Sequence, residues 1–152
     1  MRKPNRSRSP ASTSLEESVF VEMARTTDLL SRGPAQLLKE ADLSPAQYNV
    51  LRILRGSPDG LLCGQIAERM ITRDPDITRL LDRMEKRDLL RRHRDAADRR
   101  RVLVRISQEG LAALSRLDEP MQQIHIRQLG HLAPKRLQKL LRELQACRFP
   151  DK

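Results

Sequence analysis

The sequence predicts a mainly α-helical (α+β) fold in which one short β-hairpin lies among several helices. Charged residues make up 33% of the 152 residues and aromatic residues only 2%, and this Leu- and Arg-rich composition favours helices over a β-sandwich. Apolar residues recur at helical spacing through most of the chain, whereas Val102, Val104 and Ile106 stand at every second position, as in a strand. At this length we expect one compact domain.

Residues 1–14 are rich in Arg, Ser and Pro and show no apolar periodicity, so we expect a disordered basic arm. The arm would either contact phosphates or be a plain tail; a transit peptide is a weaker alternative. From residue 15 to about residue 30 one side of a helix is apolar, and Gly33-Pro34 is expected to interrupt it before a short helical piece. The apolar positions are Leu15, Val19, Met23 and Leu30, followed by Leu37 and Leu38.

The next helix begins after Ser44, which can cap it, while Gln47 can complete a capping box and Leu43 can pack as a hydrophobic staple. Residues 56–60 form a loop by their composition. The stretch LLCGQIAERM then predicts a short helix, followed by a brief turn over residues 71–73. The inward positions of the two helices are Val50, Leu51 and Leu54, then Ile66, Ala67 and Met70.

A basic helix follows, in which Asp74 can act as the N-cap and Pro75 can take the first helical position. One face is apolar and the opposite face is polar, with Thr78 and Asp82 on the flank. The apolar face carries Ile77, Leu80, Leu81 and Met84, and the polar face carries Asp76, Arg79, Arg83 and Lys86. Two short helices joined by a tight turn, the second with a polar face, are typical of a helix-turn-helix.

Residues 90–94 and 101–106 predict two strands joined by the polar residues 95–100, which together form a wing. Ser107 can cap a long C-terminal helix that Pro120 should kink or divide, and Ala133-Pro134 opens a final helix. These helices carry more apolar surface than a small helix-turn-helix core needs, so we predict a two-fold dimer built from the first helix and the last two. Their apolar positions are Leu111, Leu114, Leu117, Met121, Ile124 and Leu129, then Leu137, Leu140, Leu141 and Leu144.

The position of the positive charge indicates the partner. Of the net charge of +10, residues 1–14 hold +4 and residues 91–105 hold +5, so the rest of the chain is close to neutral. Concentration of charge in a hairpin beside a basic helix is expected of a site for a polyanion. The alternative is a solvated arginine-rich loop.

At this point the motifs GQIAERM, DITRLLDRMEKRDLLRR and DAADRRRVLVRISQEG resemble the MarR family of winged-helix transcriptional regulators over roughly residues 15–147. The resemblance implies homodimers that bind pseudo-palindromic operators and usually repress, and that often release DNA when a small molecule binds. It divides the chain into an arm (1–14), dimerisation helices (15–43 and 107–147), a winged helix (44–106) and a tail (148–152). Two positions depart from the family pattern: Asp88 replaces a helix-ending glycine, and Ala133 replaces a capping serine.

The resemblance also implies site residues. Arg100 is similar to the wing arginine that enters the minor groove, Asp98 to the aspartate that holds the wing tip, and Thr78-Arg79 to the recognition-helix pair. From the residues themselves, Arg79 is expected to read a guanine edge and Asp76 to accept from cytosine. The candidate DNA-binding residues are Thr72, Arg73, Asp76, Thr78, Arg79, Arg83 and Lys86 in the recognition helix, and Arg94, Asp98, Arg99, Arg100 and Arg101 in the wing. Those expected to neutralise phosphates are Arg91, Arg92, Arg94, Arg99 and Arg101.

Several other chemistries are not indicated. No phosphate-binding glycine loop, nucleophile–base pair or spaced metal ligands can be found, so we predict a protein that is not an enzyme and needs no cofactor or metal. Two cysteines do not make a disulfide framework and no apolar run is long enough to span a membrane, which predicts a cytoplasmic, nucleoid-associated protein. Cys63 near a helix start allows a redox-responsive regulator, although a small buried thiol is the favoured interpretation.

The predicted function is a sequence-specific double-stranded DNA-binding repressor. Architectural DNA binding without sequence preference is an alternative, as is a winged-helix module for protein interaction. RNA binding is disfavoured because the basic region lacks aromatic residues for base stacking.

Overall fold

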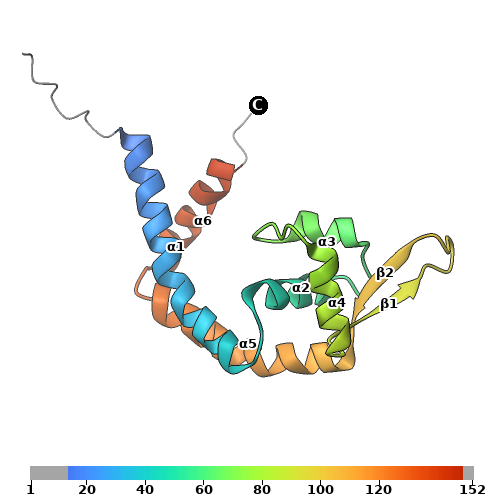
Figure 1. Cartoon of the computed structure of the whole chain (residues 1–152). Helices are drawn as coiled ribbons and strands as arrows, with labels where there is room; N and C mark the ends of the chain where they lie inside the picture. Colours follow the sequence, from blue (N-terminus) through green and yellow to red (C-terminus); the bar gives the residue numbers. More distant parts are fainter. Residues whose placement is uncertain (1–13, 149–152) are drawn as a thin grey trace, which may run out of the picture. The chain divides into compact units, whose positions relative to one another are not determined.

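The computed structural model describes residues 14–148, so the predicted arm (1–14) lies almost wholly outside the described residues, as does the tail after residue 148. The chain falls into two units, residues 1–32 and residues 33–152, and the second contains the hairpin and most of the helices. Figure 1 shows the elements in order. They are α1 (Leu15–Glu40), α2 (Pro45–Arg55), α3 (Cys63–Arg69), α4 (Ile77–Lys86), β1 (Leu90–Arg94), β2 (Val102–Ile106), α5 (Gln108–Leu129) and α6 (Pro134–Arg148).

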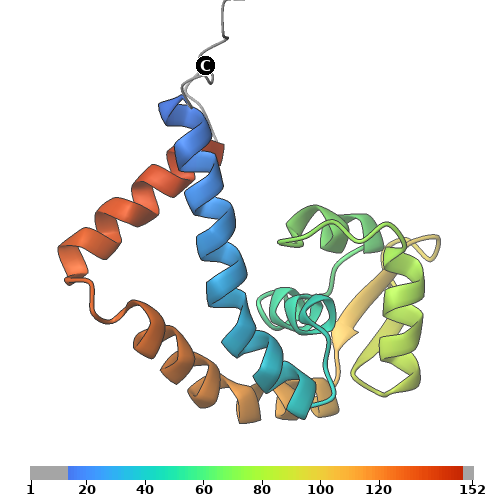
Figure 2. The ribbon, with the colours of Figure 1, turned by 60° about the vertical axis from the view of Figure 1, so that its left-hand side comes forward.

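Two helices continue through prolines at which the sequence predicted a break. The expected interruption at Gly33-Pro34 is wrong, because α1 continues through Pro34 to Glu40. Leu38 is buried on the far side of this proline, and the packing of its turn outweighs the lost hydrogen bond. Pro120 likewise lies inside α5 and does not divide it, and Figure 2 follows α5 as one ribbon.

The core of the second unit is built from α2, α3, α4, the hairpin and α5. The capping box of α2 is confirmed: Gln47 N–H donates to Ser44 Oγ at 3.1 Å, and Ser44 N–H donates to Gln47 Oε1 at 2.9 Å. The predicted inward residues of α2 and Ile66 of α3 are fully buried. In α3 the side chain of Gln65 accepts the N–H of Leu62 at 2.9 Å.

The start of α4 differs from the prediction. Asp76, not Asp74, is the N-cap, and its carboxylate accepts the N–H of Arg79 at 3.1 Å. The Asp74 carboxylate instead accepts the N–H of Asp76 at 2.8 Å, so Pro75 lies in the turn before the helix rather than in its first position. Thr72 and Arg73, grouped with the recognition helix as candidate DNA-binding residues, lie in the turn that the sequence predicts over residues 71–73.

The hairpin is antiparallel, with Leu90 opposite Ile106 and Arg94 opposite Val102. Its second strand begins one residue later than predicted, since Arg101 belongs to the turn. A third segment joins it: Leu61 and Val104 exchange two backbone hydrogen bonds of 3.0 and 2.8 Å. Val104 is buried at this bridge, which fixes the base of the wing to the core.

The junction of α4, β1 and α5 is closed by residues that the sequence singled out. Asp88, which replaces a helix-ending glycine, has the left-handed φ of 56° that a glycine would adopt there, and Leu89 N–H donates to Met84 O at 3.0 Å as in a Schellman motif. Ser107 caps α5 by accepting the N–H of Gly110 at 3.0 Å, and its hydroxyl donates to the carbonyl of Asp88. One side chain thus ties the end of α4 to the start of α5.

The last helix, α6, runs to Arg148, one residue beyond the predicted end. Its leucines at positions 140, 141 and 144 are exposed, as are Leu15 and Val19 of α1. Among residues 14–148, no helix has the length and apolar character needed to cross a bilayer.

Candidate nucleic-acid interface

Helix α4 separates its side chains as the sequence pattern predicted. Leu80, Leu81 and Met84 are buried, while Arg79, Arg83 and Lys86 are exposed on the outward side. Thr78 and, in the preceding turn, Thr72 and Arg73 are exposed as well. The helix therefore presents cations and hydroxyl groups to solvent from one side.

These cations are not neutralised within the described residues. Over residues 14–148, Arg73, Arg79, Arg83 and Lys86 form no ion pair. The carboxylates of α4 that lie near these arginines in the sequence do not pair with them, because those carboxylates have other partners. Asp76 caps the helix, and Asp82 and Glu85 bind Arg92.

Arg92 is an exception among the arginines expected to contact phosphates. Its side chain is only 26% exposed, and its two terminal nitrogens lie 2.7 Å from Asp82 Oδ1 and 2.7 Å from Glu85 Oε2. Burial alone would lower the pKa of Arg92, but the hydrogen bonds that its guanidinium donates to the two carboxylates outweigh burial and raise it. The side chain of Arg92 is thus bound to α4 and only partly exposed. The residues next to it in the sequence do not indicate this contact.

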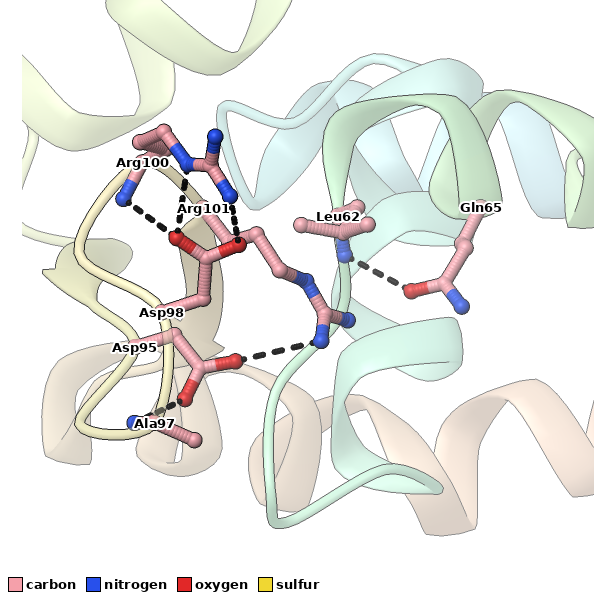
Figure 3. A network of polar contacts seen from close by, with 7 residues as sticks. All are labelled: Leu62, Gln65, Asp95, Ala97, Asp98, Arg100 and Arg101. Carbon is pink, nitrogen blue, oxygen red and sulfur yellow. Dashed lines mark hydrogen bonds and ion pairs between the residues drawn. The ribbon is translucent and has the colours of Figure 1, made fainter.

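The wing tip is held by two aspartates (Figure 3). Asp98 accepts the N–H of Arg100 at 3.0 Å and its Nε at 3.2 Å, and these bonds lower the pKa of Asp98. Asp95 accepts the N–H of Ala97 at 2.9 Å and pairs with Arg101 at 3.4 Å. Asp98 is therefore a turn residue that holds the wing tip, as the resemblance implies.

The arginines of the wing remain accessible in spite of these contacts. The side chain of Arg100 is 91% exposed although it pairs with Asp98. Arg94 and Arg99 are also exposed and have no ion pair within the described part of the chain. Arg91 pairs with Asp88 at 3.1 Å, so its charge is partly compensated.

Sequence reasoning missed a cavity of about 540 Å³ between α2, α5 and α6. Arg52 lies 5.9 Å from the centre of the Tyr48 ring, and His125 contributes a second polar group. Arg55, on the same wall, binds Asp118 through two hydrogen bonds of 2.8 and 3.0 Å. The lining residues come from positions 48 to 137, and no local pattern in the sequence marks them as neighbours.

The remaining candidates for chemistry are sparse. Among residues 14–148, no three His, Cys, Asp or Glu side chains are grouped so that they could hold a metal ion. Cys63 is the first residue of α3 and is partly buried, with its Sγ 3.9 Å from Thr78 Oγ1. Cys147 is exposed on α6.

Comparison with known proteins identifies the fold. A MarR transcription factor from Planctomyces limnophilus is 40% identical, with 87% of this chain and 96% of that chain covered and a TM-score of 0.66. CouR from Rhodococcus jostii RHA1, solved with p-coumaroyl-CoA, is 22% identical, with 93% of this chain and 99% of that chain covered and a TM-score of 0.79. A transcriptional repressor named CouR, solved with a 23-mer DNA duplex, is 25% identical, with 90% and 92% covered and a TM-score of 0.68. The HTH-type transcriptional repressor IacR of Pseudomonas putida is 27% identical over 86% of this chain and 77% of its own length.

The first curated relatives that match are named as transcriptional regulators rather than as enzymes, and the chain spans only 54 to 60% of their length. A family model described as MarR family matches residues 41–101, which include α2, α3, α4 and β1. Together with the similarity to the Planctomyces limnophilus protein over nearly its whole length, this match shows that the chain belongs to the MarR family of transcriptional regulators.

Proposed function

We propose that this protein is a homodimeric repressor that binds a pseudo-palindromic operator in double-stranded DNA and is released by a small-molecule effector. The observation that carries the proposal is the set of uncompensated cations on α4 beside the exposed arginines of the wing. A site with this charge attracts a polyanion and gains affinity by releasing counterions. CouR, a structural neighbour, was solved on a DNA duplex.

The cations fall into two groups, those suited to base edges or grooves and those assigned to phosphates. Arg79, near the start of α4, is suited to a guanine edge, and Arg100 at the wing tip is suited to a narrow minor groove. Thr72 and Thr78 supply hydroxyl groups. The cations assigned to phosphates are Arg73, Arg83, Lys86, Arg94, Arg99 and Arg101. Asp76 and Asp98 act by holding the helix start and the wing tip.

The test is selection of bound sequences from a random duplex pool, followed by footprinting. We expect an inverted repeat with half-sites about one helical turn apart; uniform protection would instead support architectural binding.

Arg79→Ala should relax the preference for the selected sequence, and Arg100→Ala should weaken binding. Arg116→Ala, which removes an exposed cation of α5, is the control, and equal effects of all three substitutions would reject the assignment.

The exposed leucines of α6 support the dimer. Leu140, Leu141 and Leu144 lie on one face by helical spacing and are 43%, 56% and 40% exposed. Leu141→Glu should give a monomer in sedimentation experiments and weaken operator binding. Ala146→Glu adds the same charge to the opposite face of α6 and should leave the dimer intact.

The cavity between α2, α5 and α6 supports an effector that is an anionic aromatic compound. Arg55 is already neutralised by Asp118, so Arg52 is the cation available to a carboxylate, beside Tyr48 and His125. CouR was solved with p-coumaroyl-CoA, which combines an aromatic ring and anionic groups. A phenolic acid that raises the melting temperature and releases the operator should lose both effects in Arg52→Gln.

A further inference from the structure

We propose that Arg92 is a positioning residue for DNA binding: it fixes the wing against α4 and forms ion pairs with two carboxylates of α4, without contacting DNA itself. The inference rests on the proposed DNA binding and adds a residue to it. The sequence predicts instead that Arg92 contacts a phosphate. The positioning role and the phosphate contact predict different DNA affinities when Arg92 is replaced together with the carboxylates that it binds.

The geometry of Arg92 is that of a clamp. Its Nη2 lies 2.7 Å from Asp82 Oδ1, its Nη1 lies 2.7 Å from Glu85 Oε2, and its backbone N–H donates to Glu85 Oε1 at 3.0 Å. Both terminal nitrogens and the main chain of β1 are therefore bound to α4. The two hydrogen bonds between the guanidinium and the carboxylates join ions and are of a stronger kind, and together with the backbone bond they fix an orientation as well as a distance.

No neighbouring arginine has this arrangement. Arg91 makes one pair, with Asp88 at 3.1 Å, and its side chain is 58% exposed against 26% for Arg92. Arg94, at the far end of β1, is exposed and without an ion pair over residues 14–148. Arg94 is therefore a matched control, since it is an arginine of the same strand that is free to meet a phosphate.

The ion pairs of Arg92 also affect the net charge of the reading face, which is the exposed side of α4 with Arg79, Arg83 and Lys86. Asp82 lies three residues after Arg79 and four before Lys86, so helical spacing brings its carboxylate close to both cations. If Arg92 were absent, Asp82 would pair with these cations, and both Asp82 and Glu85 would repel phosphates. Loss of Arg92 should therefore weaken DNA binding for two reasons. The wing is no longer fixed against α4, and two negative charges are exposed beside the reading face.

The experiment measures operator affinity of the full chain in a salt titration, with thermal melting of each variant as a control for folding. Arg92→Gln should weaken binding at least about tenfold, and more than Arg94→Gln. The triple variant Arg92→Gln/Asp82→Asn/Glu85→Gln carries no charge in the cluster and should recover the part of the loss that the two exposed carboxylates cause, so that it binds at least about threefold more tightly than Arg92→Gln. The part of the loss that comes from the freed wing remains.

A phosphate contact would give a different result. The triple variant would then stay as weak as Arg92→Gln, and its salt dependence would be shallower by about one ion per protomer. Either observation overturns the clamp. If Arg92→Gln does not fold, the salt dependence of the triple variant still decides, because the clamp predicts the slope of the wild type and a phosphate contact predicts a shallower slope. Failure of the wild type to bind any duplex would reject the proposed function, whereas weakening by Arg94→Gln without rescue in the triple variant would reject the clamp alone.

Discussion

Gly110 is fixed by a close approach of backbone at the junction between α4 and α5. A Cβ on this residue would lie 2.2 Å from the carbonyl oxygen of Leu89 and 2.8 Å from Ile106 Cγ1, and the first of these neighbours cannot move without shifting the start of β1. Gly110→Ala should therefore lower the free energy of unfolding by about 1–3 kcal/mol or more, the range typical of overpacking. Urea denaturation measures the change.

Gly64 in α3 provides the matched control, because a Cβ there meets nothing within 4 Å. Gly64→Ala should leave stability unchanged or raise it by up to about 1 kcal/mol through helix propensity. Equal losses in the two variants would show that the crowding at Gly110 is not the cause.

The pair between Arg55 and Asp118 makes stability depend on pH. The hydrogen bonds from Arg55 lower the pKa of Asp118 below its ordinary value. A carboxyl group with a lowered folded-state pKa contributes stability that is present above its unfolded pKa of about 3.9 and is lost as the pH falls through the folded-state pKa. Asp118→Asn should thus be less stable than the wild type near neutral pH, and the difference should disappear in acid.

The size of this difference is limited because the Asp118 side chain is 48% exposed, so we expect less than about 1 kcal/mol. Urea midpoints at about pH 6 and about pH 2 measure it. Glu68→Gln removes an exposed carboxylate that has no ion pair within the described residues and should show no such convergence. A difference for Asp118→Asn that persists in acid would contradict the assignment.

At the scale of the element, Asp76 determines where α4 begins. Its carboxylate accepts the N–H of Arg79, the residue assigned to a guanine edge. Asp76→Ala should lower stability by about 1 kcal/mol, whereas Asp76→Ser keeps a capping oxygen and should lower it much less. If Asp76 only caps the helix, Asp76→Ser selects the same operator sequence as the wild type. A changed base preference would restore the earlier interpretation of Asp76 as a reader of cytosine.

Elements whose signals are local could be predicted from the sequence, and those decided by packing could not. The capping box of Ser44 and Gln47, the helical periodicity of α4 and the alternation in β2 depend on residues a few positions apart, and all are found in the structure. The continuation of α1 through Pro34 depends on the burial of Leu38, which is decided by distant residues.

The candidate DNA-binding site, like the helices and strands, could be predicted from the sequence only in part. A charge count locates the basic hairpin and the exposed face of α4, but it does not distinguish one arginine from another. Arg92 faces inward because Asp82 and Glu85 lie across from it, a contact between β1 and α4 that sequence spacing does not reveal. Asp74 and Asp76 are equally good caps by composition, and the bond from the N–H of Asp76 to the carboxylate of Asp74 decides between them.

At the scale of the whole molecule, the distribution of charge determines how binding responds to salt. The exposed cations without ion pairs over residues 14–148 include Arg83 and Lys86 on α4 and Arg94 and Arg99 on the wing. Four phosphate contacts in each protomer of a dimer give a slope of log K against log salt of about −7. Between about 50 and 200 mM salt the affinity should therefore fall by about four orders of magnitude.

The same titration distinguishes contacts to phosphate from contacts to bases. Arg99→Gln should make the slope shallower by about two in the dimer, because each protomer then releases one counterion fewer, and should weaken binding to every duplex alike. Arg79→Gln should instead remove preference among duplexes and change the slope less. Fluorescence anisotropy with the selected operator and a scrambled duplex measures both quantities. A slope near −2 for the wild type would mean that the exposed cations of α4 and the wing do not meet the DNA backbone.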